Sequence, residues 1–124
     1  MLRSILKSKV HRATVTQTEL QYEGSLTLDR SLMDAADLLP HEQVMVYNIY
    51  NGERFDTYII EGERDSGIVC INGAAARKAC VGDLIIIAAY GLFEDRELGK
   101  YASKIVLLDE KNRITRVKEI PLKT

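Results

Sequence analysis

The sequence is poor in the residues that hold metals and disulfides, with two cysteines and two histidines among 124 residues. Cys70 and Cys80 form neither a CxxC pair nor a disulfide framework, and we expect both to be small buried core residues. His11 and His41 lie far apart in the sequence. A zinc site of the common Cys and His type is therefore not expected, and we predict no metal.

Long apolar runs and an excess of charge are also missing. The longest apolar run, Leu84 to Tyr90, is far shorter than the roughly 20 residues that a membrane-spanning helix needs. The first residues lack the continuous apolar stretch of a signal peptide, so we expect the chain in the cytoplasm. A formal net charge of −1 gives no general attraction to nucleic acid or to an anionic membrane, and we predict neither as a partner.

Many short segments alternate apolar and polar residues or are rich in Val, Ile and Thr, which is typical of strands. Such strands are expected at residues 4–16, 25–28, 43–50, 53–60, 67–71, 84–89, 104–108 and 114–120. Asn51-Gly52 is the favoured two-residue turn of a hairpin between two of them. Many short strands predict a mainly β fold, a closed or nearly closed barrel. The length fits one domain over residues 1–124.

Few helices are expected between these strands. Asp29 is a suitable N-cap for a helix that reaches Leu39 and ends before Pro40. Residues 72–79 predict a small-residue turn or short helix, and residues 91–102 a polar loop with a helical turn.

Five short motifs follow one another along the chain. Their order is informative, although no single motif is. They are Lys9-Val10-His11-Arg12, Tyr22-Glu23-Gly24-Ser25, Asn51-Gly52 followed by Arg54, Thr57 and Tyr58, Asn72-Gly73-Ala74-Ala75-Ala76, and Val81-Gly82-Asp83. Alone, a Gly-Ser pair is usually an ordinary turn. Together, the blocks and their spacing resemble the aspartate 1-decarboxylase family over nearly the whole chain, with a thinner likeness at residues 91–103.

The resemblance implies a chain that cuts itself between Gly24 and Ser25, into a β chain of residues 1–24 and an α chain of residues 25–124. Ser25 would attack the Gly24 carbonyl, and elimination and hydrolysis would then leave a covalent pyruvoyl group at the new N-terminus. The standard side chains offer no electrophilic carbonyl, and decarboxylation of an amino acid needs an electron sink joined to the amine. The pyruvoyl ketone supplies that sink, so neither pyridoxal phosphate nor a metal is implied.

The resemblance also implies roles in processing. Gly24 tolerates backbone conformations that are closed to other residues and leaves room for the attacking oxygen. Thr57 would donate a hydrogen bond to the intermediate at Gly24, and Tyr22 and His11 are assigned to processing as well.

For catalysis, the resemblance implies that Arg54 and Lys9 bind the carboxylates of L-aspartate and that Tyr58 protonates the carbon that has lost CO2. The substrate-binding set continues with Asn72, Gly73, Ala74 and Ala75. Alternation along a strand puts Arg54 and Tyr58 on one face and Thr57 on the other. A bend, a bulge or a second subunit would reconcile this with one site. The other tyrosines, Tyr47, Tyr50, Tyr90 and Tyr101, are expected to be packing residues.

At the level of the whole protein, the resemblance implies a double-psi β-barrel with short helices and a homotetramer with active sites between neighbouring subunits. The reaction would convert L-aspartate to β-alanine and CO2, a supply step for pantothenate and coenzyme A. Need for a maturation factor is left open. Two other readings are a barrel that binds partners without chemistry, and a pyruvoyl decarboxylase for another amino acid, which would not need two cations.

Overall fold

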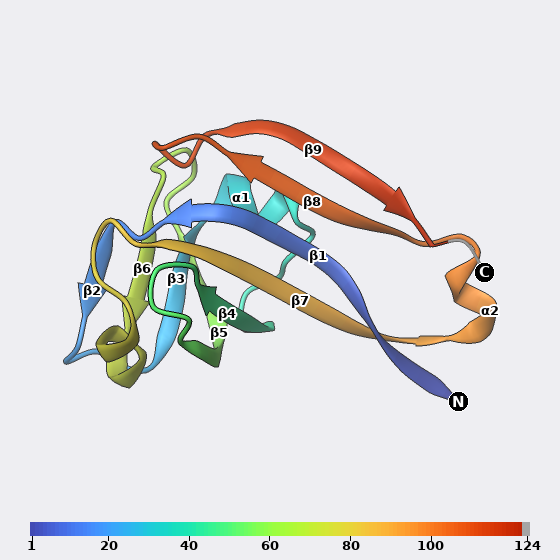
Figure 1. Cartoon of the computed structure of the whole chain (residues 1–124), viewed down its shortest axis with the longest axis horizontal. Helices are drawn as coiled ribbons and strands as arrows, with labels where there is room; N and C mark the ends of the chain where they lie inside the picture. The colour runs from blue at the N-terminus through green and yellow to red at the C-terminus, as the bar shows by residue number, and fades with distance from the viewer. Residues whose placement is uncertain (123–124) are drawn as a thin grey trace.

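The described residues, 1–122 of a computed structural model, form nine strands that share one sheet (Figure 1). The strands are β1 (Leu2–Thr14), β2 (Gln17–Glu19), β3 (Ser25–Asp29), β4 (Gln43–Asn48), β5 (Arg54–Gly62), β6 (Val69–Asn72), β7 (Leu84–Glu94), β8 (Ala102–Leu108) and β9 (Ile114–Pro121). Three short helices join them: α1 (Arg30–Ala35), the 3-10 helix η1 (Gly73–Lys78) and α2 (Asp95–Leu98). Residues 123 and 124, the last two of the predicted domain, lie outside the described residues.

The barrel closes because β2, at one end of the strand order, and β1, near its other end, are parts of one bent stretch of chain. The strand order runs β2-β6-β3-β5-β4-β7-β1-β8-β9, and only two residues separate β1 from β2. Of these, Val15 donates its N–H to the Asp83 carbonyl beside β7, and Thr16 donates to the Val69 carbonyl on β6. Within the barrel β2–β6 and β3–β5 are parallel pairs. The predicted mainly β fold class with short helices is confirmed.

Alternation along the strands fills the inside of the barrel. Leu26 and Leu28 on β3, Val44 and Val46 on β4, and Ile85 and Ile87 on β7 are each at most 1% exposed and belong to one core cluster. Their neighbours in sequence lie on the outer face of the same strands, because successive side chains of a strand point to opposite sides. Of the two cysteines, Cys70 is buried as predicted, but Cys80 is exposed.

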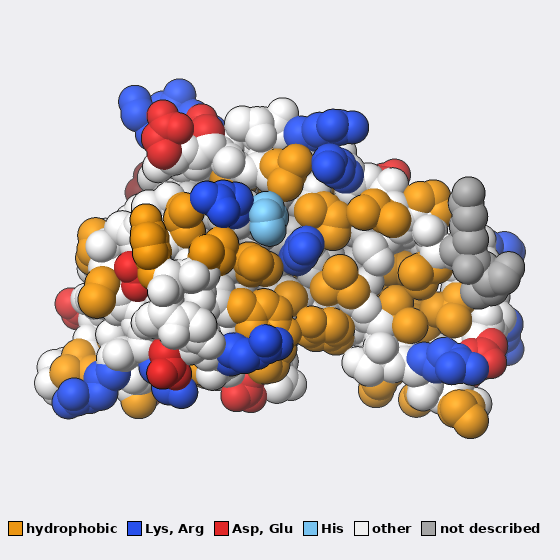
Figure 2. Space-filling view, viewed as in Figure 1, with side chains coloured by type: hydrophobic (Ala, Val, Ile, Leu, Met, Phe, Trp, Pro, Cys, Tyr) orange, Lys and Arg blue, Asp and Glu red, His pale blue; other side chains and the backbone are white. Residues whose placement is uncertain are grey.

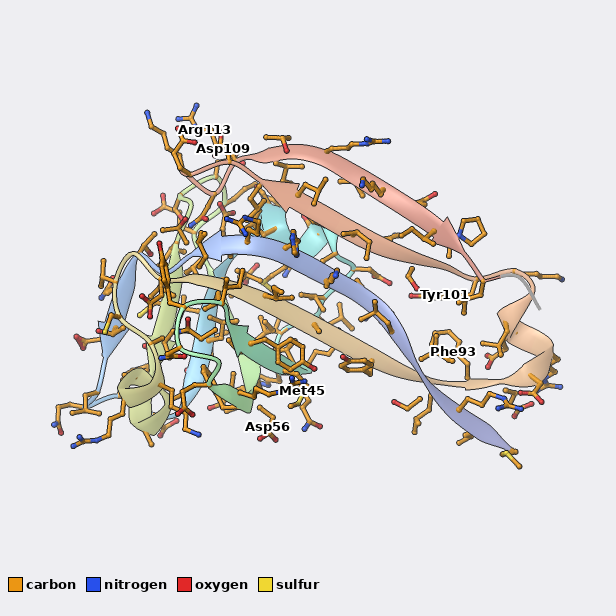
Figure 3. The ribbon with its side chains drawn as sticks, in the orientation of Figure 1. Met45, Asp56, Phe93, Tyr101, Asp109 and Arg113 are labelled. Carbon is orange, nitrogen blue, oxygen red and sulfur yellow. The ribbon has the colours of Figure 1, made fainter. Side chains whose placement is uncertain are left out.

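The chain beyond the barrel is more regular than predicted. The loop expected at residues 91–102 is wrong at its start, since β7 continues to Glu94, whereas the helical turn expected within it is confirmed as α2. Strand pairing explains the difference. The last residues of β7 pair with the first residues of β1, which lie far away in the sequence. The β8–β9 hairpin runs alongside, and the rings of Phe93 and Tyr101 meet there at 4.5 Å between centroids (Figure 3).

Two further predictions of local structure are wrong in detail. The helix α1 ends at Ala35 rather than Leu39, because Asp37 adopts a left-handed φ of 55° and Leu38 N–H bonds back to the Met33 carbonyl. The hairpin connection is longer than the two residues of Asn51-Gly52. It starts after Asn48, whose buried side chain bonds to the Lys78 carbonyl and to Asp83 and so ties the loop to η1.

Among the described residues, no helix has the length and apolar character that crossing a membrane would require.

Candidate active site

Ser25 opens β3 with a side chain that is wholly buried under that of Asn72. The two residues are direct partners in the antiparallel β3–β6 pair. Asn72 Nδ2 donates to Ser25 Oγ at 2.9 Å and to Thr27 Oγ1 at 3.0 Å, while Cys70 Sγ donates to Asn72 Oδ1 at 3.2 Å. The Ser25 hydroxyl in turn donates to the Glu23 carbonyl at 3.1 Å. The serine oxygen is thus held in one place beside the Gly24 peptide.

The backbone of Gly24 is pressed against Gly73, the first residue of η1. A Cβ at Gly73 would lie 2.6 Å from Gly24 Cα, 2.7 Å from Gly24 N and 3.0 Å from the Tyr22 carbonyl oxygen. Gly73 also has a φ of +73°, which side chains disfavour. Position 73 therefore needs glycine for two separate reasons. At Gly24, by contrast, a Cβ would meet no described atom within 4 Å.

The parallel pairing of β3 with β5 brings Thr57 and Tyr58 to the same end of β3. The pairing starts at Leu26 opposite Ile59. Extended backward, this register aligns Tyr58 with Ser25 and Thr57 with Gly24. Thr57 and Tyr58 are half-buried and point to opposite sides of the strand. The pairs of β4 with β5 show no shift between Gln43–Tyr58 and Tyr47–Arg54, so alternation holds through β5 without a bulge.

A second group of predicted residues, Lys9, His11 and Arg54, lies on the outer face of β1, β7, β4 and β5. Strand pairing arranges this face in two rows, Lys9–Ala88–Met45–Asp56 and His11–Ile86–Tyr47–Arg54. Figure 2 shows Lys and Arg side chains set among apolar ones over β1 and β7. Within the described residues, neither Lys9 nor Arg54 forms a salt bridge with a carboxylate. Both cations are therefore available to an anionic ligand.

Aromatic side chains hold Arg54 in place. Its guanidinium carbon lies 4.2 Å from the centroid of the Tyr47 ring, a cation–π contact. The hydroxyl of Tyr47 lies 2.9 Å from the hydroxyl of Tyr90 on β7. Neither tyrosine was assigned a site role from the sequence.

Burial and nearby positive charge lower the pKa of His11 on this face. Burial is the main cause, and the charges of Lys9, Arg12 and Lys118 lower the pKa further. The Nδ1 atom of His11 is buried and has no hydrogen-bond partner among the described residues.

The two groups lie on different walls of one barrel. Ser25, Asn72 and Gly73 belong to the β3–β6 side, whereas Lys9 and His11 stand on β1, across the strand order from β3. The strands β5, β4 and β7 separate β3 from β1 in the sheet. One chain therefore does not bring Lys9 and Ser25 together. Of the remaining predicted residues, Tyr22 is 56% exposed, and Ala74 and Ala75 follow Gly73 in η1.

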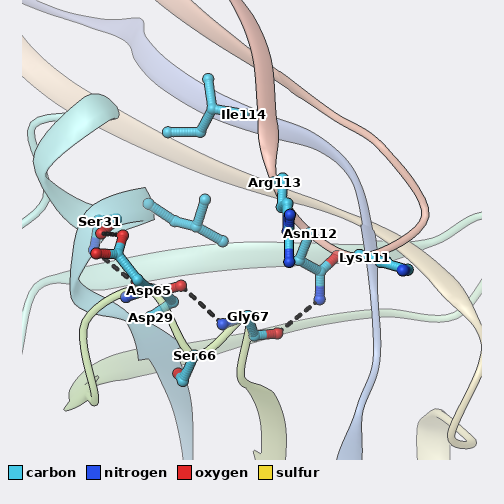
Figure 4. A pocket seen from close by; sticks show the side chains of 10 residues that line it. Asp29, Ser31, Asp65, Ser66, Gly67, Lys111, Asn112, Arg113 and Ile114 are labelled. Atoms are coloured by element: carbon cyan, nitrogen blue, oxygen red, sulfur yellow. Dashed lines mark hydrogen bonds between the residues drawn. The ribbon is translucent and has the colours of Figure 1, made fainter.

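A cavity of about 580 Å³ contains none of the predicted site residues (Figure 4). Its buried polar groups already serve the fold. The Asp29 carboxylate accepts the N–H groups of Ser31, Asp65 and Gly67, and Asn112 bonds to the Gly67 carbonyl and to the Thr14 backbone. Both side chains therefore stabilise the fold around this cavity, apart from the Ser25 group.

A buried serine held beside a glycine peptide and two cations that form no salt bridge within the described residues are features that suit an enzyme for a small anionic substrate. Comparison with known proteins agrees. The family model for aspartate decarboxylase matches residues 1–115. The chain belongs to the aspartate decarboxylase family.

Relatives named aspartate 1-decarboxylase cover most of the chain. The one from Syntrophobacter fumaroxidans is 58% identical over 91% of this chain and 91% of its own length. Those from Thermoanaerobacter pseudethanolicus and Ralstonia pickettii are 56% and 53% identical, over 91% and 96% of this chain and 97% and 99% of their own lengths. Among solved structures, a rationally designed protein titled mkDPBB_sym_86 aligns with a TM-score of 0.47 and 14% identity, over 64% of this chain and 91% of that one.

Proposed function

We propose that this protein converts L-aspartate to β-alanine and CO2 with a pyruvoyl group made from its own Ser25, and so supplies β-alanine for pantothenate and coenzyme A. Family membership supports the reaction. The observation that carries the proposal is the fixed Ser25 Oγ, held by Asn72 next to a Gly24 backbone that is packed against Gly73. When formed, the group's ketone joins the substrate amine and accepts the electrons of the broken carbon–carbon bond.

Maturation starts with the Ser25 oxygen attacking the Gly24 carbonyl carbon. The hydroxyl proton passes to the leaving amide nitrogen, and the peptide becomes an ester. Elimination then releases residues 1–24 with a C-terminal carboxylate, and water replaces ammonia at residue 25. Thr57, which the register aligns with Gly24, donates to the oxygen that becomes negative during the attack.

The residues around Ser25 suit a carbonyl at that position. Asn72 is 2% exposed and carries two amide hydrogens, one toward Ser25 and one toward Thr27. An amide donor of this kind suits a ketone oxygen as well as a hydroxyl oxygen. Gly73, Ala74 and Ala75 beside it leave room for substrate because their side chains are absent or small.

Two cations match the two carboxylates of aspartate. Arg54 presents a planar fork that suits one carboxylate, and Lys9 presents a point charge for the other. Tyr58, which the register aligns with Ser25, supplies the proton to the carbon that loses CO2. A decarboxylase for an amino acid with one carboxylate would not need both Arg54 and Lys9.

We further propose that each active site is shared between two copies in a homotetramer. The Ser25 group and Lys9 lie on different walls of one barrel, so a site that uses both takes them from neighbouring copies. Large apolar side chains exposed on β1, β7 and β9 support such an assembly: Leu2, Tyr90, Leu92, Val117 and Ile120. The cytoplasmic location stays a prediction of the sequence.

Ser25→Ala tests the proposed function. The variant should remain uncut and produce no β-alanine from L-aspartate, whereas Ser4→Ala, a change at an exposed serine, should mature and turn over normally. A Ser25→Ala protein that makes β-alanine would overturn the proposal.

Mixing two inactive variants tests the sharing of the site. If Ser25→Ala and Lys9→Ala copies assemble at random in equal amounts, about a quarter of the sites combine one intact Ser25 with one intact Lys9 from its neighbour. About a quarter of the wild-type activity should then return on co-expression. No recovery in mixed tetramers would place Ser25 and Lys9 of each site on one copy.

A further inference from the structure

Three side chains contact one another in a row across three strands: Arg54 on β5, Tyr47 on β4 and Tyr90 on β7. Arg54 on β5 and Tyr47 on β4 are direct partners, and Tyr47 pairs on its other side with Ile86 of β7. Tyr90 lies four residues further along β7 and therefore on the same outer face. The guanidinium stacks on the Tyr47 ring at 4.2 Å, and the Tyr47 and Tyr90 hydroxyls meet at 2.9 Å.

The position of a stacked guanidinium depends on the position of the ring on which it stacks. The Tyr47 side chain can rotate about two torsions, and its ring is half-buried. Unless a contact fixes the hydroxyl, the ring is attached to the protein only through its Cα. Tyr90 provides that contact at the far end of the ring. The hydrogen bond with Tyr47 is the main cause that raises the pKa of Tyr90, burial raises it further, and the charge of Arg54 opposes both. The phenol thus keeps its proton near neutral pH and can keep the bond.

Tyr90 also borders the open side of this arrangement. It lines a hollow of about 250 Å³ together with Ser4, Gln43, Met45 and Ala88, on the same outer face as Lys9 and Arg54. A ring that served only as packing would not require a hydroxyl that points along the face toward Tyr47.

We propose that Tyr90 is a positioning residue for substrate binding, which fixes the plane of the Arg54 guanidinium through the Tyr47 ring. The inference rests on the proposed role of Arg54 as the partner of a substrate carboxylate. A carboxylate needs both N–H groups of the fork at one orientation, so a ring free to turn weakens binding without changing the chemistry at Ser25. Tyr90 touches neither substrate nor reacting atoms.

Tyr90→Phe removes the hydroxyl and keeps the ring. In the matured enzyme, the KM for L-aspartate should rise about two- to tenfold, the range that one neutral hydrogen bond spans, while kcat stays within about twofold of wild type. Cleavage at Ser25, followed by intact mass, should proceed as in wild type. Tyr50→Phe is the matched control, because Tyr50 is 70% exposed and stands outside this chain of contacts, and its KM should not change.

A double-mutant cycle shows whether the two hydroxyls act as one unit. Tyr47→Phe should raise KM by the same factor as Tyr90→Phe, and the double variant should be no worse than either single one. An unchanged KM in Tyr90→Phe, a fall in kcat alone, or additive effects in the double variant would overturn the role of Tyr90. A wild-type chain that stays uncut or makes no β-alanine would instead overturn the proposed function.

Discussion

Gly73→Ala should block maturation while leaving most of the fold intact. The added Cβ would lie 2.6 Å and 2.7 Å from Gly24 Cα and N, and these are backbone atoms that cannot turn aside as a flexible side chain would. A φ of +73° adds about 1–2 kcal/mol of backbone strain, and the overlap adds about 1–3 kcal/mol. Relief of the overlap moves Gly24 away from Ser25 Oγ, and a misplacement of about 1 Å is enough to slow a reaction about 100-fold.

Gly52→Ala is the matched control, because Gly52 has a φ of +74° but a Cβ there would meet no described atom within 4 Å. Both variants carry the same backbone strain, and only Gly73→Ala carries the overlap with Gly24. Intact mass against time at constant temperature follows the fraction cut, and urea unfolding measures the loss of stability. Gly52→Ala should mature at the wild-type rate. If Gly73→Ala is cut as fast as Gly52→Ala, the contact between Gly73 and Gly24 does not prepare the peptide for attack.

Three further predictions concern other parts of the molecule. Tyr58→Phe should be cut normally but lose at least about 100-fold in kcat, measured as β-alanine formed, because the proton donor is gone; normal turnover would assign the acid elsewhere. The lowered pKa of His11 means that the unfolded chain binds more protons just below pH 6.5, so the free energy of unfolding should fall as pH drops through that value. Urea unfolding at fixed protein concentration should show a smaller fall in His11→Asn, and an equal fall would refute the assignment. Asp29→Ala removes an acceptor of three backbone N–H groups and should cost about 2–4 kcal/mol of stability without changing the site of cleavage.

Local patterns in the sequence predicted most of the strands but not their extent. The alternation of β3, β4 and the first half of β7 reflects a buried inner face, and each of these strands was predicted close to its observed place. The polar end of β7 was predicted as a loop, because its order comes from pairing with β1, which a local pattern does not contain. The hairpin turn was misplaced for a related reason: Asn48 bonds to η1, about thirty residues away.

The residues of the candidate site likewise fall into two groups, those that a local motif predicts and those that depend on the pairing of distant strands. The motif with Gly24 and Ser25 pointed to the proposed cleavage position, and the motif with Asn72 and Gly73 pointed to the residues packed beside it, because both motifs resemble those of a family. The roles of Thr27 and Cys70 around Asn72, and of Tyr90 beside Tyr47, depend on the register between distant strands. Period-two alternation did predict that Thr57 and Tyr58 face opposite sides, and the described register agrees.

The intact mass of the purified wild-type protein under denaturing conditions shows whether the chain cuts itself at Ser25. We expect two fragments, residues 1–24 and 25–124, with the larger one lighter than a serine-ended chain by one ammonia. That mass difference is the signature of the pyruvoyl group. A larger fragment with the full mass of a serine-ended chain would mean plain hydrolysis without a cofactor, and a single uncut chain after prolonged warming and after incubation with extract of its own cells would contradict self-processing at Ser25.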